Sequence, residues 1–194
     1  MKVLGITGGV GSGKSQILNY LKEFRGAYIC EMDETARKLQ KKGTDCFRRI
    51  VEQFGTGILA EDGELDRVRL GSIVFSDAGS LETLNRIVHP EVIRHVRQDI
   101  ARQEKEGTKL YVLEAALLPD AGAEVCYEIW YIYTEENIRR RRLKMSRGYT
   151  DEKITQMIAS QPSDEEFRQA STVVIDNSGS FENTKRQIGE RLRS

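Results

Sequence analysis

Short apolar runs alternate along this chain with longer stretches in which apolar residues recur every three or four positions. Short runs are typical of buried strands, and the longer period is typical of helices. We expect five strands, at Val3–Thr7, Ala27–Cys30, Leu110–Leu113, Glu128–Tyr133 and Thr172–Ile175. Their continuous hydrophobicity predicts burial on both faces, as in a parallel sheet covered by helices. The predicted fold class is therefore α/β.

The helical pattern predicts three regions of interest. A first helix from Gln16 to Phe24 should bury a stripe made of Ile17, Leu18, Leu21 and Phe24. Residues 44–106 lack a strand pattern and contain a polar turn at 61–64, so we expect an inserted helical subdomain. Residues 135–170 form a second helical segment that is rich in charged residues. Within the insert, His89 precedes Pro90 and should be extended, which predicts a break between two helices.

A phosphate-binding motif lies between the first strand and the first helix. Residues 8–15 read GGVGSGKS and match G-x-x-x-x-G-K-[ST]. A strand that leads through a glycine-rich turn into a helix aims backbone N–H groups and the positive helix end at one point. We expect a nucleoside triphosphate to bind at Gly11, Ser12, Gly13, Lys14, Ser15 and Gln16. Lys14 should reach the outer phosphates, and the Ser15 hydroxyl should hold Mg²⁺.

Acidic and amide side chains follow three of the expected strands. They are Glu31 and Asp33 after the second strand, Glu114 after the third, and Asp176 with Asn177 after the fifth. Ligands collect at the carboxyl ends of parallel strands, so we expect these groups to converge on the phosphate loop. Any one of them could instead be an acid in the first turn of a helix.

Phosphoryl transfer needs a proton acceptor, a metal and cations around the transferred group. Asp33 is placed to accept a hydroxyl proton, and Glu114 to orient metal-bound water. Residues 139–142 are four consecutive arginines, of which only one or two can face a site because helical residues are about 100° apart. Arg147 lies beside Gly148 at a bend and is the preferred mobile contact. His89 could line the acceptor site, although a lone histidine is more often a packed or capping residue.

The composition argues against several kinds of partner and site. Thirty Lys and Arg balance thirty Asp and Glu among the 194 residues, so no basic field favours nucleic acid or anionic membranes. No apolar run suits a signal peptide or a bilayer span. Cys30, Cys46 and Cys126 are widely spaced, which favours a reducing cytoplasm over a disulfide scaffold. His89 and His95 have no nearby cysteine, which argues against a zinc site.

These motifs together resemble the dephospho-coenzyme A kinase family over essentially the whole chain. The ordered set is more specific than the phosphate loop alone, and the His-Pro pair inside the insert is its most telling part. The matching segments are 5–15, Glu31-Met32-Asp33 with Ala36-Arg37, Leu65-Asp66-Arg67 with Val74-Phe75, Ile87-Val88-His89-Pro90, Leu117-Leu118, Gln161 and Val174-Ile175-Asp176-Asn177.

The resemblance implies transfer of the γ-phosphate of ATP to the 3′-hydroxyl of dephospho-coenzyme A, the last step of coenzyme A synthesis. It implies a P-loop kinase fold with a five-stranded parallel core (1–43, 107–134 and 171–194), a helical coenzyme A-binding insert (about 44–106) and a lid (about 135–170). ATP and Mg²⁺ are the implied cofactors, and a monomer or weak homo-oligomer is expected. Asp33 matches the family's catalytic aspartate, and the adenine should lie near Asn177.

Several positions depart from the family's usual residues. Glu31 and Glu114 stand where Asp is common, and the extra methylene could shift metal or water geometry. Phe167 replaces a common Arg or Lys, and Ser171 a common Asp. The arginine spacing from 142 to 147 is one residue longer than usual, which leaves the lid arginine open.

Two other functions share the phosphate loop. A nucleoside or nucleotide kinase on the same scaffold is the main alternative. A nucleotide-dependent switch is disfavoured, because the sequence has no N-K-x-D base reader. Its one D-x-x-G, from Asp176 to Gly179, follows the last strand rather than lying in mid-chain.

Overall fold

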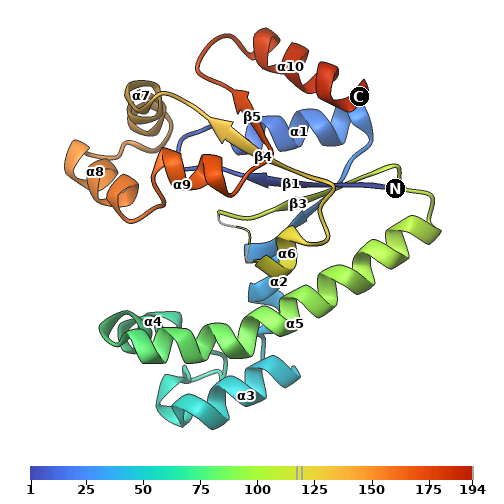
Figure 1. Cartoon of the computed structure of the whole chain (residues 1–194). Coiled ribbons are helices and arrows are strands. Elements are labelled where there is room, and N and C mark those ends of the chain that lie inside the picture. Colours follow the sequence, from blue (N-terminus) through green and yellow to red (C-terminus); the bar gives the residue numbers. More distant parts are fainter. Residues whose placement is uncertain (117, 119, 194) are drawn as a thin grey trace. The chain divides into compact units, whose positions relative to one another are not determined.

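The computed structural model describes residues 1–116, 118 and 120–193, so Leu117 lies outside the described residues. The chain divides into two compact units (Figure 1). The first contains Met1–Ile29 and Gln103–Ser194, and the second contains Cys30–Arg102. The division into core, coenzyme A-binding insert and lid stays a prediction about roles.

The five expected strands form one sheet with the order β2-β3-β1-β4-β5. Strand β1 pairs in parallel with β3 and β4, and β4 pairs in parallel with β5. The predicted α/β class with a five-stranded parallel sheet is therefore confirmed. The strands are β1 (Lys2–Thr7), β2 (Tyr28–Glu31), β3 (Leu110–Glu114), β4 (Glu128–Tyr133) and β5 (Val173–Asp176).

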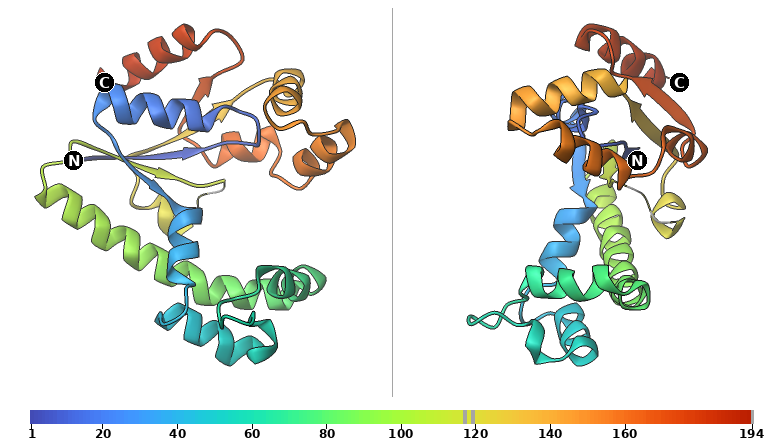
Figure 2. Two further views of the ribbon diagram at one scale, coloured as in Figure 1. Left: turned by 180° about the vertical axis from the view of Figure 1, so that it is seen from behind. Right: turned by 90° about the vertical axis from the view of Figure 1, so that its left-hand side faces the viewer.

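One face of the sheet packs against α1 (Lys14–Arg25) and α10 (Phe181–Arg193), which Figures 1 and 2 show on the same side. Alternate strand residues such as Leu4, Ile6 and Trp130 join Ile17 of α1 and Ile188 of α10 in one buried cluster. Side chains alternate across a strand, so this cluster uses every second strand residue. The main core thus lies directly beneath the helix that follows the phosphate loop.

The other face is covered less evenly. Phe167 stacks on Tyr131 of β4 at 4.9 Å between ring centroids and is fully buried. Strands β1 and β3 are buried on both faces, as the sequence predicts. The same prediction is wrong for β5, where Val174 is 37% exposed, because Val173 and Ile175 face α1 and α10 while Val174 points to the opposite face of the sheet.

Helix α1 confirms most of its predicted stripe. Ile17, Leu18 and Leu21 are buried. Phe24 is 69% exposed, so its predicted place in the stripe is wrong. It lies in the last turn of α1 and stacks on Tyr20 at 5.5 Å between ring centroids.

The second unit is helical, as expected. It contains α2 (Met32–Leu39), α3 (Asp45–Phe54), the 3₁₀ helix η1 (Thr56–Ile58), α4 (Arg67–Ser76) and most of α5 (Ala78–Lys105). Helix α3 contacts α2 and η1, and α4 contacts η1. The polar turn is present: Gly63 has a φ of 79°, and the Glu64 N–H donates to the Asp62 carboxylate at 3.0 Å.

The predicted helix break at His89 is wrong. Helix α5 runs through 28 residues with Pro90 inside it. Buried residues lie on both sides of the proline, at Ile87 and Val88 before it and at Val92 and Val96 after it. Burial of this continuous apolar stripe favours an unbroken helix, which outweighs the local preference of a residue before proline.

The second helical segment forms α7 (Glu136–Arg147), α8 (Asp151–Ala159) and α9 (Asp164–Gln169). A short helix, α6 (Asp120–Ala123), precedes β4. Figure 1 shows α7 to α9 beside the carboxyl ends of the strands. Gly148 ends α7 in a left-handed conformation, Thr150 caps α8, and Ser163 and Glu166 form a capping box at α9. These signals explain why the segment breaks into three helices.

Candidate nucleotide-binding site

The phosphate loop connects β1 to α1 and is shaped by glycine. Gly11 and Gly13 have φ values of 76° and 88°, which residues with a Cβ rarely adopt. The Ser12 N–H donates to the Gly9 carbonyl at 3.2 Å and closes the turn. The sequence GSG therefore bends the chain so that α1 begins directly after the loop.

The start of α1 suits an anion. Gly13 is the N-cap, a position where Ser, Thr, Asp or Asn usually supplies an oxygen to the first N–H groups. Glycine supplies no such oxygen, and the first turn of α1 contains no acidic residue. Ser15 and Gln16 are exposed in this turn, and the Gln16 N–H donates to the Gly13 carbonyl at 3.1 Å. The helix thus presents its positive end without a competing negative group of its own.

Lys14 lies across the loop. Its Nζ donates to the Gly8 carbonyl at 2.6 Å and is 3.8 Å from Glu114 Oε1 at the end of β3. Both side chains are largely shielded, with 17% and 12% of their surfaces exposed. The expected meeting of Glu114 with the phosphate loop is therefore present.

Asn177 lies behind the loop. Its side chain is buried and donates from Nδ2 to the Ser12 carbonyl at 2.8 Å, while Oδ1 accepts from Thr184 of α10 at 2.9 Å. Asp176 instead accepts from the Ser178 N–H at 2.8 Å, which stabilises the turn between β5 and α10. Of this pair, it is Asn177 that reaches the loop.

The four arginines of α7 divide as helical geometry requires. Arg139 and Arg142 face the loop: Arg139 Nε donates to the Val10 carbonyl at 2.9 Å, and Arg142 Nη2 donates to the Asn177 carbonyl at 2.9 Å. Burial, with a smaller effect of Arg141, lowers the pKa of Arg142, which still remains charged. Arg140 turns outward and pairs with Glu136 at 2.7 Å, and Arg141 is exposed.

Arg147 lies at the exposed end of α7, with its guanidinium carbon 5.9 Å from the ring centre of Tyr149. Interaction with the Arg147 side chain, with a smaller effect of Lys153, lowers the pKa of Tyr149. Arg139 and Arg142, not Arg147, hold the loop in this structure. A contact of Arg147 with phosphate stays a prediction.

Comparison with known proteins identifies the family. A family model described as dephospho-CoA kinase matches residues 2–183. A dephospho-CoA kinase from Carboxydothermus hydrogenoformans is 38% identical over 97% of this chain and 91% of its own length. One from Geobacter sulfurreducens is 37% identical over 98% and 96%. This chain belongs to the dephospho-CoA kinase family.

Solved structures agree on the fold. A crystal structure from Thermus thermophilus superposes with a TM-score of 0.80 at 29% identity and covers 99% of this chain and 96% of that one. A shikimate kinase from Acinetobacter baumannii reaches a TM-score of 0.53 at 13% identity, covering 100% and 94%, and shows the shared fold alone. The predicted P-loop kinase fold is confirmed.

Two of the residues predicted to serve the acceptor, Asp33 and His89, belong to the second unit. Asp33 is exposed in the first turn of α2, and Glu31 is the N-cap residue of that helix. His89 is exposed in the middle of α5. Exposure leaves both side chains open to a ligand, and their roles toward the acceptor stay predictions.

Sequence reasoning missed two residues as loop contacts. Gln161 Oε1 accepts from the Val10 N–H at 2.8 Å and from Arg139 Nη2 at 3.3 Å. Thr134 Oγ1 lies 3.0 Å from the Ser12 carbonyl. Thr134 directly follows β4, so its position in the sequence is the same as that of the polar residues that follow the other strands and are expected at the loop. Gln161 lies between α8 and α9, and its only sequence signal is the match to the family.

The structure describes three of the positions that the resemblance marks as unusual. Phe167 packs its ring on Tyr131 and is buried, so an apolar side chain suits this position. Ser171 Oγ is buried without a hydrogen-bond partner among the described residues. Glu114 keeps its carboxylate beside Lys14 despite the longer arm.

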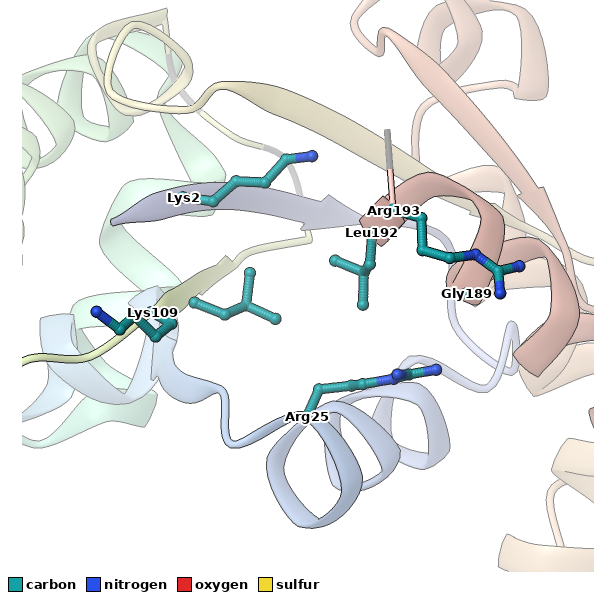
Figure 3. Close-up of a pocket in the computed structure, with 7 residues that line it drawn as sticks. Lys2, Arg25, Lys109, Gly189, Leu192 and Arg193 are labelled. Atoms are coloured by element: carbon teal, nitrogen blue, oxygen red, sulfur yellow. The ribbon is translucent and has the colours of Figure 1, made fainter.

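A separate pocket of about 340 Å³ opens near the beginning of β1, away from the phosphate loop at its end (Figure 3). Arg25 and Arg193 lie in the last turns of α1 and α10, where cations stabilise the helix dipole. Stabilisation of the two helices therefore accounts for these arginines, and no ligand is needed to explain them. The lining residues are Lys2, Arg25, Lys109, Leu110, Gly189, Leu192 and Arg193.

Among the helices that the structure describes, none has the length and hydropathy needed to cross a bilayer.

Proposed function

We propose that this protein phosphorylates the ribose 3′-hydroxyl of dephospho-coenzyme A with ATP, giving coenzyme A and ADP in the last step of coenzyme A synthesis. The observation that carries the proposal is a complete phosphate loop at a helix start, in a chain that matches the dephospho-CoA kinase family over residues 2–183. Kinase activity follows from the family, and the residue roles below belong to the proposal.

The phosphates of ATP would bind at the backbone N–H groups of the loop and the start of α1. Lys14 contacts the Gly8 carbonyl at 2.6 Å, and a phosphate oxygen is a stronger acceptor because it is charged. Lys14 would therefore exchange the carbonyl for the outer phosphates and stabilise the charge of the transferred group.

Mg²⁺ fits the donor set of this site. Magnesium usually takes one or two protein oxygens, with water and phosphate completing its octahedron. Ser15 offers an exposed hydroxyl at the helix start, and Glu114 offers a carboxylate 3.8 Å from Lys14 Nζ. Ser15 would bind the ion directly, Glu114 would orient its water, and the bound ion would neutralise phosphate charge.

The acceptor side of the proposal rests on the second unit and the α7 segment. Asp33 would take the proton of the 3′-hydroxyl, and its exposed position in α2 leaves the carboxylate accessible. His89 would line the acceptor site, Arg147 would contact the transferred phosphoryl, and Asn177 would lie near the adenine. The first three roles follow from the positions of these residues in the sequence, and the place of Asn177 near the adenine follows from the resemblance to the family.

The substrate is a small molecule, and we propose neither nucleic acid nor membrane as a partner because the net charge is zero. The three cysteines are thiols, which suits a reducing cytoplasm. A monomer or weak homo-oligomer is the proposed state.

A coupled assay of ADP release tests the function. Purified enzyme with ATP and Mg²⁺ should turn over with dephospho-coenzyme A and far more slowly with adenosine or AMP. Turnover with adenosine or AMP, and none with dephospho-coenzyme A, would identify a nucleoside or nucleotide kinase instead. The phosphorylated position is checked by the phosphorus spectrum of the product.

A further inference from the structure

The outer side of the phosphate loop is held by side chains from several distant segments. The Ser12 carbonyl accepts from Asn177 Nδ2 at 2.8 Å and Arg142 Nη1 at 3.3 Å, and Thr134 Oγ1 lies at 3.0 Å. The Thr134 hydroxyl is also 2.8 Å from the Tyr133 carbonyl, so its one proton is shared. A carbonyl oxygen has two lone pairs, and three donors therefore saturate it.

This arrangement fixes the peptide group between Ser12 and Gly13. A trans peptide is planar, so its C=O and N–H point in opposite directions. The side chains that bind the Ser12 carbonyl therefore keep the Gly13 N–H pointing away from them, toward the side of the loop where phosphate would bind. Gly13 is the N-cap of α1, so the same contacts also fix where the helix starts.

The two peptide groups on either side of the Val10 Cα are also held by side chains. Arg139 Nε donates to the Val10 carbonyl at 2.9 Å, and the Val10 N–H donates to Gln161 Oε1 at 2.8 Å. Arg139 Nη2 also donates to Gln161 Oε1 at 3.3 Å and links the two contacts. Both polar groups of Val10 are thus bound by the segment that contains α7 to α9.

Two glycines of the loop allow this close approach. A Cβ on Gly9 would collide with the Arg139 guanidinium, and one on Gly13 would collide with the Asn177 amide. These two positions therefore serve the contacts behind the loop as well as the bend of its backbone.

We propose that these five side chains form a loop clamp that holds the P-loop in its phosphate-binding shape and so sets the affinity for ATP. The clamp consists of Thr134, Arg139, Arg142, Gln161 and Asn177. Thr134 and Gln161 act in it as positioning residues, through backbone groups rather than through the nucleotide. The α7–α9 segment then contributes to ATP binding before it makes any contact with phosphate.

Gln161 gives the sharpest test. Leucine removes the acceptor for the Val10 N–H, whereas glutamate keeps an oxygen for it and for Arg139. Gln161→Leu should raise the Kd of ATP by about threefold to tenfold, and Gln161→Glu should stay within about twofold of the wild type, from the usual strength of one hydrogen bond. Gln156→Leu on the exposed side of α8 is the matched control and should leave the Kd unchanged.

Thr134 gives a second test, on the peptide group between Ser12 and Gly13. Thr134→Val should weaken ATP binding by about threefold to tenfold, and Thr134→Ser should restore it, because serine keeps the hydroxyl. The control is Thr155→Val, since Thr155 is an exposed residue of α8 that accepts from Arg140 at 3.0 Å. If one of the apolar variants does not fold, the other pair decides the proposal.

Two further measurements distinguish a positioning role of Gln161 and Thr134 from a general loss of structure in the variants. Amide exchange at Val10 and Gly13 should speed up in the apolar variants and return to normal in the conservative ones. The KM for ATP should rise while the KM for the acceptor stays constant. An unchanged Kd in the apolar variants, or equal losses in the conservative ones, would overturn the proposal. The Kd is measured with ATP alone, so this outcome is independent of whether dephospho-coenzyme A is the acceptor.

Discussion

Lys14 is held inside the phosphate loop by oxygen atoms of the protein. Its ammonium donates to the Gly8 carbonyl at 2.6 Å and lies 3.8 Å from the Glu114 carboxylate. A phosphate oxygen is a charged acceptor, so its hydrogen bond with an ammonium is stronger than the bond with a neutral carbonyl. We therefore expect bound phosphate to draw the Lys14 ammonium away from the Gly8 carbonyl.

Replacement of Lys14 by alanine should abolish most turnover. The variant loses the charge that stabilises the transferred phosphoryl, and kcat/KM should fall by at least about 10²-fold, the usual effect of removing one such donor. Steady-state ADP release measures this change. Lys22→Ala, at an exposed position of the same helix, is the control and should remain fully active. Comparable activity in both variants would contradict the role of Lys14.

Asp33→Asn tests the proposed base. The amide has the same shape but cannot take a proton, so kcat should fall by ~10²–10⁴ while the Kd of ATP stays the same. The neighbouring Glu34→Gln, also exposed in α2, should have little effect. Near-normal turnover of Asp33→Asn would reduce Asp33 to an acid that stabilises the first turn of α2.

Among the elements, α5 departs furthest from its sequence pattern. Proline removes one backbone N–H from a helix and crowds the preceding turn, yet Pro90 lies inside 28 helical residues. His89 and Pro90 are both exposed, whereas Ile87, Val88 and Val92 are buried. The proline thus lies on the solvent side, where the helix can accommodate it while its apolar stripe stays continuous.

Pro90→Ala should stabilise the protein. Alanine restores the missing hydrogen bond, and the gain should be about 1–2 kcal/mol after the greater freedom of the unfolded chain is subtracted. Urea unfolding of both proteins measures it. Pro162→Ala is the matched control, because Pro162 precedes the N-cap of α9 and lies outside a helix. A loss of stability in Pro90→Ala would instead favour the helix break that the sequence predicts.

For the whole molecule, the nucleotide site belongs to one of the two units. Its loop, α1, Glu114, Asn177 and the clamp all lie in Met1–Ile29 and Gln103–Ser194. The second unit, Cys30–Arg102, contains Asp33 and His89, whose roles toward the acceptor stay predictions. The proposed donor-side and acceptor-side residues are therefore found in separately packed parts of the chain.

ATP should stabilise the protein through the first unit. With Mg²⁺ and ATP at 100 times the Kd, binding should add about 2.7 kcal/mol to the free energy of unfolding, by mass action. The thermal midpoint should rise by roughly 5–11 °C for a chain of this size. Amide exchange should show the added protection first in β1 and α1. The Lys14→Ala variant should show a much smaller shift at the same ATP concentration; an equal shift would place the nucleotide elsewhere.

The sequence by itself determined the features that depend on local order. The five strands, the phosphate loop at residues 8–15 and the expectation that only one or two of the arginines at 139–142 face the loop all follow from periodicity and spacing, whereas the structure identifies these two as Arg139 and Arg142. The motif order also pointed to the family. These features are local because strand alternation, helical rotation and glycine conformations act over a few residues.

Only the tertiary structure decided the features that depend on distant partners. The exposure of Phe24 and Val174, the unbroken helix at Pro90, and the contacts of Gln161 and Thr134 with the loop could not be read from neighbouring residues. Gln161 lies 151 residues from Val10 in sequence, and Thr134 lies 122 from Ser12. Such contacts exist because the sheet brings remote segments together, and burial there can outweigh local preference.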